Sequence, residues 1–265
     1  TYFLCEQCGM VQLSYFDEQM IKYSDRAYFF EEYKEQYGKT YLEDMENLKN
    51  FAQKRLDVIE NILPSKGKLL DIGCAYGAFL KEAFDRGWNP VGVDVSQPAI
   101  DYVKDTWKIP AICTDFASRN LNGFIPRDNN CITLWYVIEH FTALGLVLTR
   151  INQLLRIGGV LAFSTPSRSG VSARSNRQNF YKNSPDDHWT IWSPQILKTI
   201  LARYGFSVKQ IKITGHHPER FPWFKAKPGT LIYTILMVIS KVFKLGDTFE
   251  CYAVKVKNLD FFDTL

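Results

Sequence analysis

Short apolar runs and amphipathic segments alternate through the middle of this chain. Segments with helical patterning separate the apolar runs, which lie at 68–72, 90–93, 111–114, 131–135 and 160–164. Strands that alternate with helices in this rhythm predict a parallel sheet with helices on both faces. We therefore expect a doubly wound α/β fold with its helices at 77–86, 97–106 and 142–156. Ser96 is expected to cap the second helix, and Gly158-Gly159 to end the third.

The segments that flank this core carry patterns of their own. Residues 16–63 lack proline and bear apolar residues at three- to five-residue spacing, which predicts an N-terminal helical arm packed on the core. Its aromatic residues could close over a ligand or could be plain packing: Tyr23, Tyr28, Phe29, Phe30 and Tyr33. We assign 64–257 to the core domain, 1–15 to a separate N-terminal piece and 258–265 to a tail.

After the last predicted parallel strand, a polar and basic stretch at 167–184 has the composition of a substrate loop. A helix then begins after Ser193 and ends at Gly205, and alternating patterns predict strands at 206–211 and 248–256. Within the insertion 215–247, residues 230–243 are apolar on most sides and flanked by lysines. This segment is too short to span a bilayer. It predicts either a buried lid helix or an amphipathic helix at a membrane interface, and we favour the lid.

Composition narrows the class of protein. The chain has 265 residues, of which 46% are hydrophobic and 15% aromatic, so a folded domain is expected. A net charge of +4 permits anionic substrates or a membrane surface, but it is far from that of a dedicated nucleic-acid binder. We find no signal peptide and no apolar run of about 18 residues, so we expect a cytoplasmic protein, with peripheral contact with a membrane as the alternative. Because the sequence begins at Thr1, we expect further residues upstream.

Two of the six cysteines stand apart from the others. Cys5 and Cys8 form a Cys-x-x-Cys-Gly turn, which can present two thiolates to one zinc ion. A structural zinc needs four ligands, and no second pair follows at a useful spacing. We interpret the turn as a remnant zinc half-site, with a redox pair or an intermolecular site as alternatives. The other four cysteines lie singly in apolar runs, where a thiol behaves as a small hydrophobe.

The chemistry of the core concentrates around a glycine turn. Residues 68–80 predict a strand, a tight turn with Gly73 and Gly77, and the start of a helix. Asp94 ends the next apolar run, roughly 20 residues further on, where an acid can accept hydrogen bonds from ribose hydroxyls. The pattern indicates a site for a nucleoside cofactor.

From about residue 67 to 257 the chain resembles the class I S-adenosylmethionine-dependent methyltransferases. The resemblance rests on Asp71-x-Gly73-x-x-x-Gly77, on Asp94 and Asp115 at strand ends, and on the segments 135–141 and 154–161. It implies a seven-stranded, mostly parallel sheet whose last strand is antiparallel. Ala75 departs from the family, many members of which have a glycine there. The Asn/Asp-Pro-Pro-Tyr tetrad of enzymes that methylate base or amide nitrogens is also missing, which argues against DNA, adenine-directed RNA and glutamine-directed protein substrates. The Cys-x-x-Cys beginning resembles a subset with an N-terminal zinc module, several of which act on nucleotide-linked sugars or on polysaccharide and lipid precursors.

The resemblance also assigns roles to individual residues. The glycine turn would pass close to the methionine part of the cofactor, with Asp71 near its amino group. Asp94 would bind both ribose hydroxyls, although a carboxylate that only stabilises a turn is the alternative for both acids. Asp115 would accept the adenine amine. The full set of expected cofactor contacts is Asp71, Gly73, Cys74, Ala75, Tyr76, Gly77, Phe79, Asp94, Val95, Asp115, Phe116, Trp135, Tyr136 and His140.

Methyl transfer to an oxygen needs a base to remove the acceptor's proton, and histidine is the usual base near neutral pH. His140 and His188 are the candidates, and a purely structural role is open for both. Glu139 could help to hold a divalent ion, although one carboxylate makes a poor magnesium site. We expect a small-molecule acceptor, namely a hydroxyl of a sugar, polysaccharide, lipid or quinone-like precursor. An RNA or protein methyltransferase and a non-catalytic cofactor-binding module are the alternatives.

Overall fold

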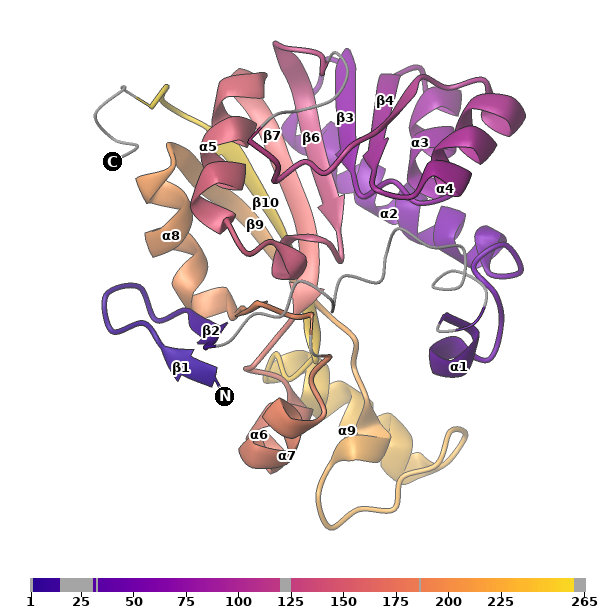
Figure 1. The fold of residues 1–265 in the computed structure, drawn as a ribbon. Helices are drawn as coiled ribbons and strands as arrows, with labels where there is room; N and C mark the ends of the chain where they lie inside the picture. Colours follow the sequence, from indigo (N-terminus) through magenta and orange to yellow (C-terminus); the bar gives the residue numbers. More distant parts are fainter. Residues whose placement is uncertain (1, 15–30, 32, 120–124, 186, 260–265) are drawn as a thin grey trace.

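A seven-stranded sheet forms the centre of the computed structural model, which describes residues 2–14, 31, 33–119, 125–185 and 187–259 (Figure 1). The strand order is β5-β4-β3-β6-β7-β10-β9. The first five of these strands are parallel, whereas β10 runs antiparallel to both β7 and β9. The predicted doubly wound sheet with an antiparallel last strand is therefore confirmed. The strands are β3 Lys68–Ile72, β4 Asn89–Asp94, β5 Ala111–Cys113, β6 Asn129–Trp135, β7 Leu155–Pro166, β9 Phe206–Thr214 and β10 Thr248–Lys255.

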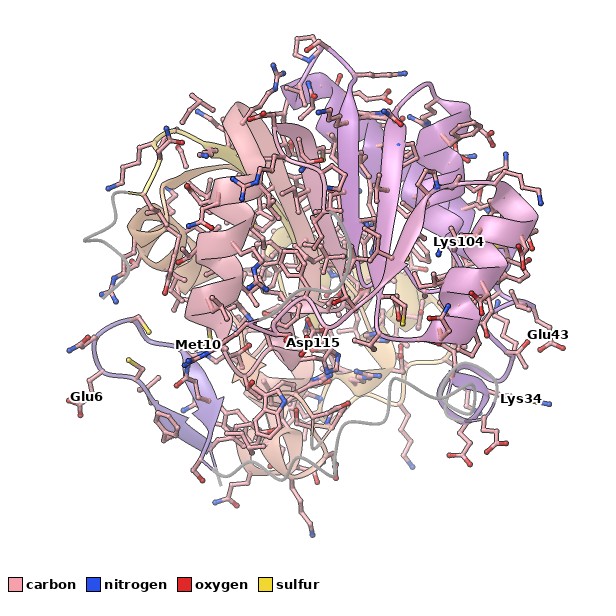
Figure 2. All side chains as sticks on the ribbon, turned by 45° about the horizontal axis from the view of Figure 1, so that its top comes forward. Glu6, Met10, Lys34, Glu43, Lys104 and Asp115 are labelled. Atoms are coloured by element: carbon pink, nitrogen blue, oxygen red, sulfur yellow. The ribbon has the colours of Figure 1, made fainter. Side chains whose placement is uncertain are left out.

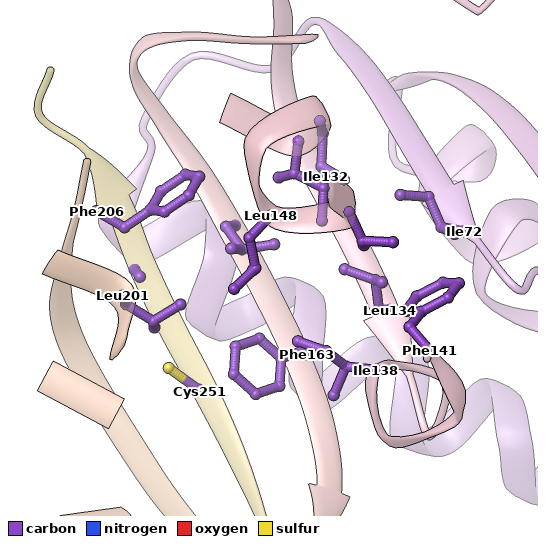
Figure 3. Close-up of a cluster of buried hydrophobic side chains, with 14 of the residues drawn as sticks. Ile72, Ile132, Leu134, Ile138, Phe141, Leu148, Phe163, Leu201, Phe206 and Cys251 are labelled. Atoms are coloured by element: carbon purple, nitrogen blue, oxygen red, sulfur yellow. The ribbon is translucent and has the colours of Figure 1, made fainter. Parts of the chain in front are cut away.

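Helices cover both faces of this sheet. Because successive side chains of a strand point to opposite faces, Leu69 packs on one side and Leu70 on the other. The side of Leu69 is covered by α2 (Met45–Ile62), α3 (Ala78–Asp85) and α4 (Gln97–Tyr102), which a π-helical turn, Val103–Trp107, extends. The side of Leu70 is covered by α5 (Leu144–Leu154) and α8 (Leu197–Arg203). Figure 3 shows the second core, in which side chains of β6, β7, α5 and α8 interdigitate.

The helix expected at 142–156 ends two residues early, at Leu154, and β7 begins at Leu155. The side-chain amide of Asn129 donates a hydrogen bond to the carbonyl oxygen of Leu154 at 3.0 Å, which satisfies one of the carbonyls exposed at the end of the helix. Gly158, with φ of +79°, therefore lies within the strand rather than at the helix end. The expectation that Gly158-Gly159 stops the helix was wrong, because a distant side chain supplies the cap.

The polar stretch after β7 is more ordered than the predicted loop. It contains two short helices, α6 (Val171–Ser175) and α7 (Arg177–Lys182). Nearby, β1 (Tyr2–Leu4), β2 (Val11–Leu13) and β8 (Thr190–Ile191) form a small antiparallel sheet that the sequence patterns did not predict. Short 3-10 turns span Ile138–His140, Pro194–Ile196 and Pro218–Arg220.

The N-terminal arm contains α1 (Tyr33–Tyr37) and α2 in its described part. Of the arm's predicted aromatic cluster, Tyr23, Tyr28, Phe29 and Phe30 lie outside the described residues. The apolar segment of the C-terminal insertion forms α9 (Leu231–Val242), at the bottom of Figure 1. Only Leu236 and Ser240 of this helix are buried, so it is not the buried lid that we favoured. Within the described residues, no helix has the length and apolar character needed to cross a membrane.

Candidate functional site

The glycine loop between β3 and α3 has a backbone that few side chains tolerate. Gly73 and Gly77 have φ of +74° and +79°. A Cβ atom on Gly73 would lie 2.3 Å from Cγ2 of Val137, and one on Gly77 would lie 2.9 Å from Cγ2 of Val103. Both positions thus require glycine for conformation and for space. Ala75 is also left-handed, with φ of +46°, a strain of about 1 kcal/mol that its neighbours must offset.

Asp94, at the end of β4, holds this loop in place. Its Oδ2 accepts a hydrogen bond from the backbone amide of Ala75 at 2.8 Å, and its Oδ1 accepts one from Ser96 at 2.9 Å. Burial raises the pKa of Asp94, and these amide bonds oppose that shift. Asp94 therefore does stabilise the turn, which was the alternative to ribose binding for this residue. Each carboxylate oxygen still has a second lone pair, so the two roles are compatible.

Asp71 lies deeper, within β3, and is only 1% exposed. The hydroxyl of Thr133 donates a hydrogen bond to its Oδ1 at 2.7 Å. Burial raises the pKa of Asp71 to about 7, against the opposing effects of the Thr133 bond and of Arg55. A carboxyl with this pKa changes charge near neutrality, so a cationic amino group beside it would favour its ionised form.

The residues expected around the adenine are divided by the fold. Asp115 is exposed just beyond β5, near the middle of the view in Figure 2, and its carboxylate accepts a hydrogen bond from the amide of Ala117 at 2.8 Å. Val95, directly after β4, is half-buried. Phe116, by contrast, is 2% exposed and belongs to the core, where it packs against Phe141. The Phe116 ring is thus part of the packed core, and its contact with the adenine stays a prediction.

A cluster of rings marks the end of β6. Trp135 packs against Phe79 in a tilted arrangement with a centroid distance of 5.1 Å, and the Arg55 guanidinium lies 4.2 Å from the Trp135 ring centroid. The indole N–H of Trp135 is buried and has no hydrogen-bond partner among the described residues. Tyr136 is 43% exposed and has φ of +60°, a conformation that is costly outside glycine and is concentrated at functional sites.

Sequence reasoning missed two residues of this region. Arg55, on α2, donates a hydrogen bond to Glu250 at 3.0 Å and so ties the arm to β10 beneath Trp135. Tyr41 brings the arm to the glycine loop, since its ring packs against Tyr76 at 5.8 Å. Burial raises the pKa of Tyr41, with Asp71 and Asp94 among the smaller contributions. Nothing in local spacing singles out Arg55, but the tyrosine-rich composition of the arm could have indicated Tyr41.

The loop between β6 and α5 brings His140 to His188. Their ring centroids are 4.8 Å apart in an edge-to-face arrangement. Nδ1 of His140 lies 3.1 Å from the carbonyl oxygen of Asp187. Because a carbonyl can only accept, this contact places a proton on Nδ1 and leaves Nε2 with the basic lone pair. Burial lowers the pKa of His140 to about 4 and that of His188 to about 3, so both rings are neutral at pH 7.

Glu139 completes a possible metal-binding group. One ligand atom each of Glu139, His140 and His188 lies within 4.8 Å of the others, and this is the sole such group of three or more in the described part of the chain. Glu139 is 1% exposed, one of its oxygens has no hydrogen-bond partner, and burial raises its pKa to about 8. Two imidazoles and one carboxylate suit zinc or another transition metal better than magnesium.

The Cys5–Cys8 turn lies at the tip of the β1–β2 hairpin, where Glu6 points outward (Figure 2). Both cysteines are free thiols. The Cys8 backbone lowers the pKa of Cys5, whereas burial raises the pKa of Cys8. Within the described residues the pair has no additional ligand close enough to form a group of three, so an N-terminal zinc module is not supported.

A cationic recess of about 500 Å³ opens between this hairpin and α7. Its lining holds three cations and no carboxylate, together with the rings of Tyr2 and Tyr181. Two residues of the lining connect the recess to the segment that holds His188. Ser184 lies four positions before His188 in the sequence, and the backbone amide of Leu13 donates a hydrogen bond to the carbonyl oxygen of Trp189 at 2.9 Å. The Nε–H of Arg168 is buried and has no hydrogen-bond partner in the described structure. The cationic residues are Arg168, Arg177 and Lys182.

Comparison with known proteins gives this geometry a family context. A family model described as a methyltransferase domain matches residues 41–211. The ubiquinone biosynthesis O-methyltransferase of Actinobacillus pleuropneumoniae is 29% identical over 126 residues, which cover 43% of this chain and 53% of that protein. The malonyl-[acyl-carrier protein] O-methyltransferase of Acetivibrio thermocellus is 28% identical over 123 residues, or 44% of this chain and 42% of that protein. The aligned regions thus span about half the length of these relatives.

A solved structure shares the architecture. The SAM-dependent methyltransferase from Archaeoglobus fulgidus superposes with a TM-score of 0.60 at 19% identity, over 87% of this chain and all of that one. At this identity the likeness extends to the fold. The family match begins before α2 and ends within β9, so it includes the glycine loop, Asp94 and the histidine pair.

Proposed function

We propose that this chain, which belongs to the methyltransferase-domain family, transfers the methyl group of S-adenosylmethionine to a hydroxyl of a small-molecule acceptor. The observation that carries the proposal is that the loop pinned by Asp94 follows the carboxyl end of β3, while His140, paired with His188, follows that of the neighbouring strand β6. In a parallel sheet, this edge is where ligands bind.

The loop fits the nucleoside cofactor on structural grounds. The close approach of Val137 and Val103 leaves no space for a side chain at Gly73 or Gly77, so the backbone itself lines the site. Asp94 keeps a lone pair on each oxygen for ribose hydroxyls, and Asp71 offers a carboxyl for an amino group. The bound cofactor would supply an electrophilic methyl group. The residues of this chain would align the acceptor with that methyl group. In an in-line displacement, such proximity and alignment are the main contribution of the protein to catalysis.

His140 is proposed as the base that removes the acceptor's proton. Its Nδ1–H is held by the Asp187 carbonyl, so the ring presents Nε2 as the accepting atom. With the pKa lowered to about 4, the ring is neutral and its Nε2 lone pair is unprotonated throughout the physiological range. His188 packs against the His140 ring and is proposed to orient it. Oxygen as the acceptor atom also agrees with the names of the two relatives, both O-methyltransferases.

The cationic recess supports an acceptor with an anionic group. Three cations without a carboxylate favour phosphate or carboxylate, and arginine binds either in a bidentate manner. Tyr181 and Tyr2 add aromatic surface beside these charges, which suits a ring-containing acceptor such as a phosphorylated sugar or lipid precursor.

A transfer assay with radiolabelled S-adenosylmethionine tests the proposal. Matched acceptors with and without a phosphate should be compared across sugar-nucleotide, lipid and quinone-like compounds. Methylation of a hydroxyl supports the proposal if the KM for the phosphorylated acceptor, but not for its unphosphorylated match, rises in Arg177→Ala and Lys182→Ala. Lys209→Ala, an exposed lysine of β9, is the control. Cofactor binding without transfer to any acceptor would favour a binding module, and transfer only to RNA or protein would replace the acceptor class.

A further inference from the structure

One face of α9 is apolar and open to solvent. Leu231, Ile235, Val238 and Val242 follow one another at helical spacing, with exposed fractions of 77%, 49%, 55% and 67%. An amphipathic helix normally turns such a stripe towards the core. Since only Leu236 and Ser240 of the helix are buried, the stripe of α9 faces outward from the described structure.

Exposed rings extend this apolar surface on both sides of the helix. Trp223 is 95% exposed and Phe224 44%, in the loop that precedes α9, and Phe243 directly after it is 67% exposed. So many exposed apolar side chains within one short segment indicate an interaction site rather than chance exposure. An exposed tryptophan at the margin of such a surface is typical of proteins that bind the interfacial region of a bilayer.

The charges around the surface have one sign. Lys225, Lys227, Lys241 and Lys244 are all exposed. Between residues 221 and 245 the sequence contains no aspartate or glutamate. This cationic rim is complementary to anionic lipid headgroups. It disfavours a second copy of the chain as the partner, because a two-fold contact through this face would bring two sets of lysines together.

We propose that residues 221–245 bind the surface of an anionic lipid bilayer. Helix α9 lies in the plane of the interface with its stripe among the acyl chains, while the lysines contact the headgroups. Its 12 residues are enough for this arrangement and too few to span. The inference goes beyond the proposed methyl transfer and does not depend on it.

The helix is firmly joined to the rest of the chain. His216 and Ser240 are in hydrogen-bond contact at 2.7 Å between Nδ1 and Oγ, and the amide of Val171 donates to the Leu245 carbonyl at 2.9 Å. Figure 1 shows α9 on the side of the molecule towards which β6 and β7 run. Binding through α9 would therefore bring the ligand edge of the sheet close to the lipid surface.

Flotation of the full chain with vesicles tests the proposal. Vesicles of phosphatidylcholine alone are compared with vesicles that also contain phosphatidylglycerol, at low and high salt. Ile235→Ser/Val242→Ser removes apolar contact, and Lys241→Glu/Lys244→Glu reverses charge, both on exposed positions where folding should be unaffected. Ile157→Ser, at a position on β7 that is 52% exposed, is the matched control.

The wild type and the control should float with the anionic vesicles, and each double variant should lose about tenfold or more in partitioning. Trp223 fluorescence should shift to shorter wavelength on binding, and Trp223→Phe should abolish this shift. Failure of the wild type to bind anionic vesicles overturns the proposal, as does binding that both double variants retain. A dimer in light scattering that Ile235→Ser/Val242→Ser dissociates, without vesicle binding, would instead assign the face to a second copy.

Discussion

The carboxylate of Asp94 accepts a hydrogen bond from the backbone amide of Ala75 at 2.8 Å, across 19 positions of sequence. The acid that ends β4 thus sets the shape of the loop that follows β3. Since Ala75 is left-handed, this bond also offsets a local strain. Cofactor binding and loop stability are therefore expected to depend on the same side chain.

Loss of this carboxylate should destabilise the fold as well as the site. In Asp94→Ala the amides of Ala75 and Ser96 lose their acceptor, and each buried bond to a charged group is worth about 1.5–3 kcal/mol. Urea unfolding should show a lower free energy of unfolding, by roughly 2–4 kcal/mol after relaxation. Asp94→Asn keeps one acceptor oxygen and should lose less. Equal losses in the two variants would contradict the assignment of both oxygens.

A methyl group on Gly73 should be far more harmful than one on Gly87. Both glycines have positive φ, at +74° and +86°. A Cβ on Gly73 would lie 2.3 Å from Val137, whereas a Cβ on Gly87 meets nothing within 4 Å. Gly87→Ala should cost only the conformational strain of about 1 kcal/mol, and Gly73→Ala should cost several times that and displace the loop. Thermal unfolding of both variants measures the difference, and similar melting temperatures would argue against the tight contact.

The pH dependence of turnover should report a histidine with a low pKa. A general base works in its neutral form, and His140 is neutral above a pKa of about 4. We expect kcat to stay level as the pH falls from 8 to 5.5 and to decline only near 4, provided that the protein stays folded. His140→Ala should retain cofactor binding and lose about 100-fold or more in kcat. His217→Ala, on the surface turn before α9, is the control. An acid limb near 6.5 in the wild type would mean that another group is the base.

Glu139→Gln should stabilise the metal-free protein increasingly as the pH rises from 5 to 8. The pKa of Glu139 is raised to about 8 in the folded chain against 4.5 for an ordinary glutamate. A raised pKa gives stability that is complete below 4.5 and is lost as the pH rises to 8, because only the unfolded state ionises easily there. The free energy of unfolding of the variant should therefore rise relative to that of the wild type between pH 5 and pH 8, by an amount on the order of a few kcal/mol.

The same variant tests the metal group. If Glu139, His140 and His188 bind a cation, zinc should raise the melting temperature of the wild type, and a chelator should reverse the effect. Glu139→Gln should weaken this response to zinc. An equal response in wild type and variant would exclude Glu139 as a ligand.

Cutting the contact between Arg55 and Glu250 should loosen the arm. The two side chains are 11% and 5% exposed, so Arg55→Ala removes the nearer cation from a buried carboxylate and leaves only Lys212, whose Nζ lies 3.8 Å from Glu250 Oε2. A loss of about 3–5 kcal/mol in unfolding free energy is expected, and the double variant Arg55→Met/Glu250→Gln should recover most of it. Lys81→Ala removes an exposed i, i+4 pair and should cost less than about 1 kcal/mol. Additive losses in the double variant would contradict a direct pair.

The strands of the core could be predicted because each is a short apolar run closed by a turn residue or an acid. Asp71 and Asp94 could be placed at one edge of the sheet because parallel strands end together. The end of α5 at Leu154 could not be predicted, since the side chain that caps it, Asn129, lies 25 positions away in the sequence. The burial of Phe116 in the core could not be predicted either, because it depends on how the chain turns after β5.

The contact of His140 with His188 was only partly predictable. Both residues could be selected as candidates by their chemistry, but they are 48 positions apart. Their contact depends on the small β1-β2-β8 sheet, whose strands are too short to show a sequence pattern. The exposure of α9 escaped prediction for a different reason. An apolar helix has the same composition whether it is buried in protein or directed towards lipid.

Calorimetric titration of the full chain with S-adenosylhomocysteine tests the central claim most directly. We expect saturable, equimolar binding to the wild type, and at least a 100-fold loss of affinity in Asp94→Ala, from the removal of hydrogen bonds to a charged group. Gly87→Ala should bind like the wild type. Absence of binding to the wild type, or undiminished affinity in a folded Asp94→Ala variant, would contradict the assignment of this sheet edge as the cofactor site.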